Sequence, residues 1–116
     1  MKLKQIIKEL DLEPVYLADP EVEVNGGYAG DLLSNVMAGA QEKDVWITIQ
    51  AHQNIVAVAL LVEVAAVVIA QNMEIDEKAL MRAKEKGINL LSSPLTIYEI
   101  AGRLYSLGVG GGNEKV

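Results

Sequence analysis

Two β-branched runs with an apolar helix between them constrain the fold of this chain most. The segments WITIQ (46–50) and AAVVIA (65–70) have the composition of buried strands, and residues 54–63 between them are apolar on every side. A strand, a helix and a second strand in this order form a β-α-β unit, whose strands lie parallel in one sheet. We therefore predict an α/β fold with three layers, α/β/α, around a mostly parallel or mixed central sheet.

Helical spacing and turn residues predict the remaining elements. Two helix starts carry capping residues, because Asp31 precedes an apolar helical pattern and Thr96 begins a T-x-x-E capping box. Gly87 and Gly108 are typical of helix ends. The elements predicted in this way are helices over 2–10, 32–40, 76–87 and 96–108, strands over 15–17, 22–24 and 88–91, and a glycine-rich loop over 25–31.

Length and composition limit the class of protein. The 116 residues are 51% hydrophobic, which predicts one domain over residues 1–108, followed by a flexible tail over 109–116. The absence of cysteine excludes disulfides, thiolate metal sites and a cysteine nucleophile, and it suits a reducing cytoplasm. A net charge of −6 argues against nucleic-acid binding, because phosphate backbones are held by clustered Lys and Arg. We expect a cytoplasmic protein.

The sequence also argues against a membrane protein. Its longest apolar run, residues 55–70, is interrupted by Glu63 and is shorter than the roughly 20 residues of a spanning helix. Residues 1–13 carry charges throughout and lack the apolar core of a signal peptide. We therefore expect no contact with a membrane.

Polar clusters follow the predicted strands and predict where a ligand binds. The carboxyl ends of parallel strands meet at one edge of a sheet, and this edge is the usual place for a small ligand. Short polar connections also occur in sheets that bind nothing, so each cluster alone is a weak signal. The candidate ligand-binding residues are Gly26, Gly27, Gly30 and Asp31; Gln50, His52 and Asn54; Gln71 and Asn72; and Ser92 and Ser93.

His52 is the single histidine and the one candidate for acid or base catalysis. It is either a general base or a hydrogen-bonded loop residue before the helix at residues 54–63. A second histidine for a typical zinc site is absent, and neither serine nor aspartate near His52 indicates a triad. The glycines match neither the phosphate-binding loop G-x-x-x-x-G-K-[ST] nor G-x-G-x-x-G. We expect no metal, and the sequence leaves the cofactor unknown.

Three segments carry a resemblance to a known family. GGYAGDLLSNVMA (26–38), WITIQAHQNIVAVALL (46–61) and EKGINLLSSPLTIYEIAGRLY (85–105) resemble stand-alone DRTGG-domain proteins, which are similar to the amino-terminal domain of HPr kinase/phosphorylase. The resemblance implies an α/β domain with a regulatory, sensory or assembly role, often dimeric. Genes for such proteins often lie near those for iron-only hydrogenases, which implies a link to anaerobic redox metabolism.

The naming motif of that family is altered in this chain. Ala51-His52 stands where the motif has Asp-Arg, and residues 70–72, Ala-Gln-Asn, stand where it has Thr-Gly-Gly. The ATP-binding loop of HPr kinase belongs to a separate carboxyl-terminal domain, outside the part that this chain resembles. The resemblance therefore implies no kinase activity.

Our first hypothesis is a noncatalytic regulatory domain that binds a small metabolite or a protein partner as a homodimer. The dimer is expected because Leu60 and Leu61 cannot both face the sheet when the helix over 54–63 is apolar all round. The alternative is a small enzyme that uses His52 as acid or base. Its substrate would be oriented by Gln50, Asn54 or Asn72. A third hypothesis, a structural accessory to a redox enzyme, rests on the resemblance alone.

Overall fold

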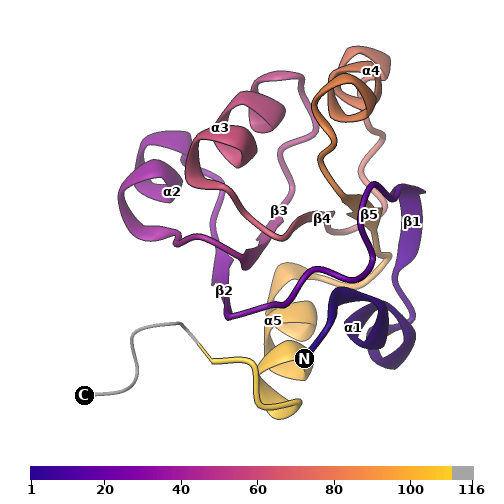
Figure 1. Cartoon of the computed structure of the whole chain (residues 1–116), viewed down its shortest axis with the longest axis vertical. Helices are drawn as coiled ribbons and strands as arrows, with labels where there is room; N and C mark the ends of the chain where they lie inside the picture. The colour runs from indigo at the N-terminus through magenta and orange to yellow at the C-terminus, as the bar shows by residue number, and fades with distance from the viewer. Residues whose placement is uncertain (111–116) are drawn as a thin grey trace.

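One mixed sheet of five strands forms the centre of the molecule (Figure 1). The computed structural model describes residues 1–110, and its strand order is β1-β5-β4-β3-β2. Strands β2 to β5 are parallel, and β1 pairs antiparallel with β5. The strands are β1 (Glu13–Tyr16), β2 (Gly26–Ala29), β3 (Asp44–Thr48), β4 (Ala66–Ile69) and β5 (Leu90–Ser92).

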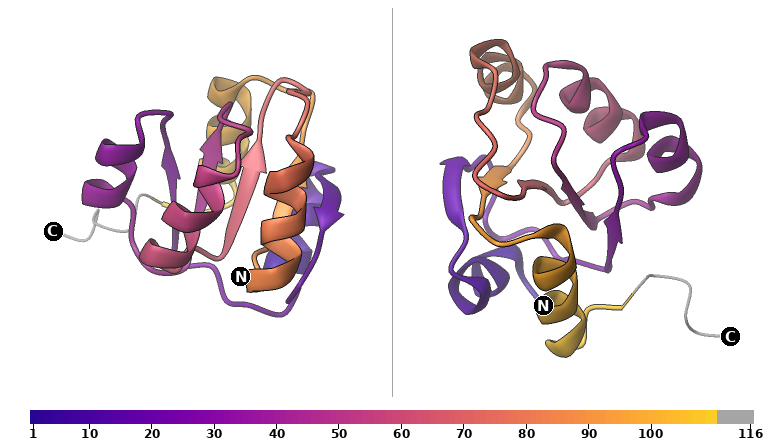
Figure 2. Two further views of the ribbon diagram at one scale, coloured as in Figure 1. Left: turned by 90° about the horizontal axis from the view of Figure 1, so that it is seen from above. Right: turned by 180° about the vertical axis from the view of Figure 1, so that it is seen from behind.

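Helices cover both faces of this sheet, which confirms the three-layer α/β/α prediction (Figures 1 and 2). Helices α1 (Leu3–Leu10) and α5 (Ile97–Ser106) lie on one face. The other face carries α2 (Leu33–Gly39), α3 (Asn54–Val62) and α4 (Glu77–Lys86). Within residues 1–110, no helix has the length and apolar character needed to cross a lipid bilayer.

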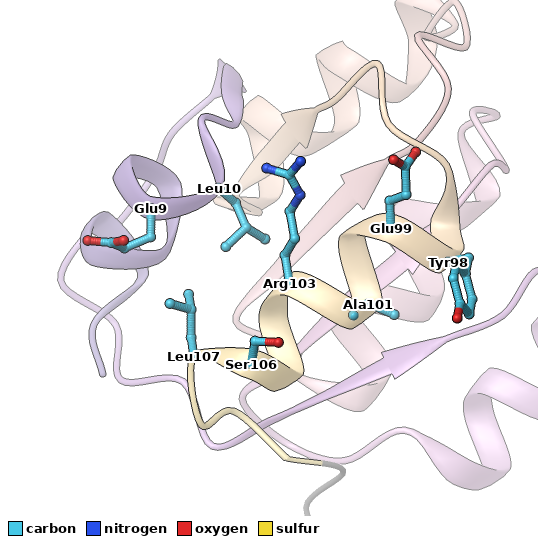
Figure 3. A pocket seen from close by; sticks show the side chains of 9 residues that line it. Glu9, Leu10, Tyr98, Glu99, Ala101, Arg103, Ser106 and Leu107 are labelled. Atoms are coloured by element: carbon cyan, nitrogen blue, oxygen red, sulfur yellow. The ribbon is translucent and has the colours of Figure 1, made fainter.

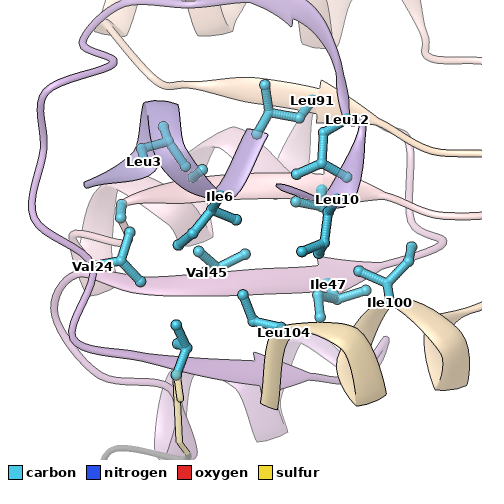
Figure 4. Close-up of a cluster of buried hydrophobic side chains, with 14 of the residues drawn as sticks. Leu3, Ile6, Leu10, Leu12, Val24, Val45, Ile47, Leu91, Ile100 and Leu104 are labelled. Atoms are coloured by element: carbon cyan, nitrogen blue, oxygen red, sulfur yellow. The ribbon is translucent and has the colours of Figure 1, made fainter. Parts of the chain in front are cut away.

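The two helical layers explain why the central strands are apolar without alternation. Successive side chains of a strand point to opposite faces, so Val45 and Ile47 pack towards α1 and α5 (Figure 4), while Trp46 packs towards α2 and α3. All five residues of β3 and all four of β4 are buried. The helices packed on both faces of the sheet therefore hold the strands, and with them the strand ends, in place.

Helix α3 is covered on one side and exposed on the other. Ile55, Val56 and Ala59 are buried in the core between the sheet and the neighbouring helices, whereas Leu60 and Leu61 are exposed. The expectation that these two leucines cannot both face the sheet is met, because neither does. A dimer through this helix remains an expectation.

The segment predicted as a glycine-rich loop is partly a strand, so that prediction was wrong. Gly26 and Gly27 belong to β2, which pairs in parallel register with β3. A Cβ atom on Gly27 would lie 2.9 Å from Leu104 Cδ2, so the missing side chain lets α5 pack closely on β2. The predicted strand over 22–24 is reduced to one isolated bridge between Lys2 and Glu23.

The chain after α5 returns to the edge of the sheet. Val109 is buried in the core on the α1 and α5 face, and the Gly110 carbonyl accepts a hydrogen bond of 2.9 Å from Gly27 N–H. The first two residues of the predicted tail are thus packed against β2. The rest of that tail, residues 111–116, lies outside the described residues.

Candidate functional site

Asp31 joins the carboxyl ends of β2 and β3. Its carboxylate accepts hydrogen bonds from Thr48 Oγ1 at 2.8 Å and from Ile49 N–H at 2.9 Å, and its carbonyl accepts one from Gln50 Nε2 at 3.1 Å. The prediction of Asp31 as a helix cap was wrong, since Leu32 takes the N-cap position of α2. Asp31 therefore fixes the end of β3 beside the segment that follows β2, and the Gln50 amide is already engaged.

A strained turn follows β4 and is tied to the end of β5. Gln71 and Asn72 both take the left-handed conformation, with φ of 61° and 51°. Their N–H groups donate to Leu95 O at 2.9 Å and Ser93 O at 3.0 Å. Ser93 is buried, and its Oγ accepts a hydrogen bond from Leu95 N–H. These bonds fix the backbone and leave the Gln71 and Asn72 side chains exposed.

The carboxyl edge carries two separate hollows of about 400 Å³ each. One is lined by Asn72, Ser92 and Ser93, together with residues 11–14 at the start of β1. The other is lined by Ala51, His52 and residues 74–77 at the start of α4. His52 and Asn72 thus line different hollows, although the sequence predicted a single crevice. This separation leaves the enzymatic hypothesis without Asn72 to orient a substrate beside His52.

Both hollows are acidic. Asp11 and Glu13 line the first, and Glu74, Asp76 and Glu77 line the second. Neither lining includes a lysine or an arginine. Within residues 1–110, no group of three or more acidic or histidine side chains is arranged to hold a metal ion. Such linings favour neutral or cationic ligands over phosphates, because like charges repel.

The other predicted site residues lie outside these hollows. Gly26 and Gly27 begin β2 and so lie at the amino-terminal edge of the parallel strands, opposite the predicted crevice. Gly30 accepts a hydrogen bond from Trp46 Nε1 at its carbonyl. Asn54 is the exposed first residue of α3. The predicted residues that line one of the two hollows at the carboxyl edge are His52, Asn72, Ser92 and Ser93.

A larger groove of about 750 Å³, which the sequence did not predict, separates α1 from α5 (Figure 3). Leu10, Ala101 and Leu107 form apolar parts of its lining, and the Arg103 side chain lies between the two helices. Tyr98 also lines this groove, and it lies outside the apolar stripe of the predicted helix.

Asp44 is a buried carboxylate at the amino-terminal edge of the sheet. It is 1% exposed, and its Oδ2 accepts a hydrogen bond of 2.8 Å from Gln41 N–H. Its Oδ1 has no hydrogen-bond partner among residues 1–110. Burial raises the pKa of the Asp44 carboxyl above its ordinary value, and the hydrogen bond from Gln41 opposes this shift less strongly.

Replacing Asp44 with asparagine should remove the contribution of this carboxyl group to the pH dependence of stability. Between the ordinary and the raised pKa of Asp44, the native chain binds more protons than the unfolded chain, so this group makes stability fall as pH rises. The slope from one group is at most about 1.4 kcal/mol per pH unit. Urea unfolding of both proteins from pH 3.5 to 7 measures it. We expect the free-energy difference, wild type minus Asp44→Asn, to decrease with pH, and an increasing difference would contradict the assignment.

The wild type is compared with Asp44→Asn because other carboxylates change the free energy of unfolding with pH in the opposite direction. The pKa of Glu21 is lowered by its hydrogen bond with Lys4, and that of Glu23 by its hydrogen bond with the amino terminus. These two groups make stability rise with pH in both proteins, and the subtraction removes their effect.

Comparisons with known proteins place the fold. No protein-family model and no curated protein matches the sequence. The chain is similar in structure to the CBS and DRTGG domains of the regulatory region of Clostridium perfringens pyrophosphatase, solved in complex with its activator, diadenosine tetraphosphate. The TM-score is 0.68 with 16% identity, over 96% of this chain and 48% of that one. This chain spans about half of that region and shares the fold of the part that it matches.

Proposed function

We propose that this chain is a noncatalytic regulatory domain of the DRTGG type, which binds a small polar metabolite and acts as a cytoplasmic homodimer. The observation that carries the proposal is the hollow at the carboxyl edge, where the amide of Asn72 on the hydrogen-bonded turn and the hydroxyl of Ser92 at the end of β5 line one space beside the buried Ser93. The shared fold with a pyrophosphatase regulatory region that binds an activator supports it.

The charge of the hollow selects the ligand class. Asp11 and Glu13 lie on the same lining as Asn72, and no cation lines it. A neutral or cationic metabolite, such as a nucleoside or an amine, therefore fits better than a polyphosphate. This chain is then expected to differ from its structural neighbour, whose activator is a dinucleoside tetraphosphate.

The other hypotheses have less support. The enzymatic alternative still has His52 in a hollow, but Gln50 is hydrogen-bonded to Asp31 and Asn54 lies outside that hollow. The similarity to the HPr kinase amino-terminal domain and the link to a redox enzyme rest on the sequence resemblance alone. Noncatalytic binding accounts for more of the geometry.

A thermal-shift screen tests the proposal, with adenosine, AMP, diadenosine tetraphosphate and a set of amines as probes. A ligand present at 100 times its Kd stabilises the native state by about 2.7 kcal/mol. For a domain of this size, that corresponds to a rise in Tm on the order of 10 °C. We expect a rise with neutral or cationic probes and a smaller one with phosphates. A response to the tetraphosphate alone would contradict the proposed charge class.

Variants of the turn after β4 locate the response. Asn72→Gly removes a lining side chain and relieves the positive φ, and we expect about 3–10-fold weaker binding, the scale of one lost hydrogen bond. Gln71→Gly is the matched control, since it changes the same turn at a side chain outside both hollows. If His52→Gln abolished a catalysed reaction while the circular dichroism spectrum was preserved, the noncatalytic proposal would have to be abandoned.

A further inference from the structure

Gly102 is an interior glycine of α5 that nothing in its own domain explains. Glycine destabilises a helix interior relative to alanine, so its presence there usually serves close packing. A Cβ atom on Gly102 would meet no atom within 4 Å in the described part of the chain. Gly27 and Gly39 differ, because Cβ atoms there would lie 2.9 Å from Leu104 and Tyr28 side chains. Gly102 lies on a surface where a second molecule would gain from its small size.

Two exposed tyrosines flank Gly102 on the same face of α5. Tyr98 is 86% exposed and lies four residues before it, and Tyr105 is 67% exposed and lies three residues after it. Residues at these spacings are neighbours on one helix face. Tyrosine is enriched in the cores of protein interfaces. The face is therefore a ridge with a low centre, formed by Tyr98, Gly102 and Tyr105.

Opposite charges lie along one side of this ridge. Glu99 is in the first turn of α5 and Arg103 in the last, and Figure 3 shows both on the groove side of the helix. Among residues 1–110, Arg103 forms no ion pair. Glu99 uses Oε1 in the capping box with Thr96, which leaves its second carboxylate oxygen for another donor. Each helix thus presents one anion and one cation.

We propose that α5 is the interface of the homodimer, and that the α5 helices of two copies pack antiparallel and cross at Gly102. A two-fold axis opposite the midpoint between residues 101 and 102 places Tyr98 against the partner's Tyr105. With a rise of 1.5 Å per residue, Glu99 lies about 4 Å before the midpoint and Arg103 about 2 Å after it. The axis therefore brings Glu99 beside the partner's Arg103 twice, in an isologous contact.

The exposed side of α3 does not offer this complementarity. Its sequence, NIVAVALLV, contains no charged residue, so Leu60 and Leu61 give an apolar surface without a preferred orientation. The inference rests on the homodimer in the proposed function and gives it an interface. It also explains Tyr98, Gly102 and Arg103, which the ligand-binding proposal leaves without a role.

Charge reversal on α5 tests the interface with the full-length chain. Arg103→Glu gives each copy two anions on this face, and Glu99→Arg gives each copy two cations. We expect each variant to self-associate at least 10-fold more weakly than the wild type, because like charges meet across the axis. Mixed together, the two variants should form a 1:1 heterodimer, since every facing pair is then opposite in charge. Sedimentation velocity and native mass spectrometry measure both results.

Controls separate failure of this interface from failure of the dimer. If the wild type is a monomer at 100 μM, both the dimer and its interface are refuted. A different result would place the dimer interface on α3. In that case the wild type and both charge variants dimerise equally well, and Leu61→Glu gives monomers. Circular dichroism of each variant must match the wild type. Gly102→Ala should also weaken the dimer while the monomer remains folded, because a Cβ atom at the crossing point meets nothing within 4 Å in the described part of its own chain.

Discussion

Replacing Asn89 with aspartate is expected to destabilise the protein by about 3–5 kcal/mol. Asn89 Oδ1 accepts hydrogen bonds from the N–H groups of Ala18 and Asp19 at 2.7 and 2.8 Å, and Nδ2 donates to the carbonyls of Asp19 and Ala65 at 3.0 and 2.9 Å. The residue is 5% exposed. Aspartate has no N–H to donate, so two carbonyl oxygens would face a buried carboxylate.

Urea unfolding monitored by circular dichroism measures this loss at pH 7. Asn25→Asp is the matched control, because Asn25 is exposed and the same chemical change there should alter stability by no more than about 0.5 kcal/mol. The expected loss is a large share of the roughly 5–15 kcal/mol that stabilises a domain. A loss below about 1 kcal/mol for Asn89→Asp would show that its hydrogen bonds do not hold the 17–19 segment to the sheet.

Truncating Asp31 to alanine is expected to cost about 2–4 kcal/mol. The carboxylate is the acceptor for the Thr48 hydroxyl, which is fully buried, and for the Ile49 N–H. Alanine leaves both donors without this partner at the point where β3 ends. The same bonds position the end of β3 beside β2, so the loss should appear as a lower free energy of unfolding.

Two further variants separate the hydrogen bonds of Asp31 from its charge. Asp31→Asn keeps an acceptor oxygen at Oδ1 and should lose less stability than Asp31→Ala. Thr48→Val removes one donor, so a double-mutant cycle between the alanine and valine variants should show a coupling of about 1 kcal/mol or more. Additive losses would mean that the hydrogen bond between the two side chains contributes nothing to folding.

The central strands and several helix ends could be predicted from sequence because local signals and tertiary contacts agree there. The run at 65–70 is buried by helices on both faces, as its composition indicates, and Thr96 and Glu99 form the capping box that their spacing predicts. Gly26 and Gly27 were predicted to lie in a loop and instead belong to β2. Their low strand propensity is outweighed by pairing with β3 and by the close approach of Leu104.

The site was only partly predictable for a similar reason. Parallel strands had to bring Asn72 and Ser92 to one edge, and a sequence pattern can show that. The same pattern cannot show that the Asp31 side chain turns inward to Thr48, because both residues have to be placed in space first. The contacts of Asn89 with Ala18 and Ala65 join segments far apart in the chain and carried no local signal.

A titration followed by amide chemical shifts in ¹⁵N-labelled protein tests the central claim most directly, with the neutral or cationic probe that gives the largest thermal shift. We predict saturable shifts at Asn72, Ser92 and Ser93 and at residues 11–13, with Gln71→Gly behaving as the wild type and Asn72→Gly binding more weakly. Shifts confined to the hollow around His52, or to the groove between α1 and α5, would contradict it.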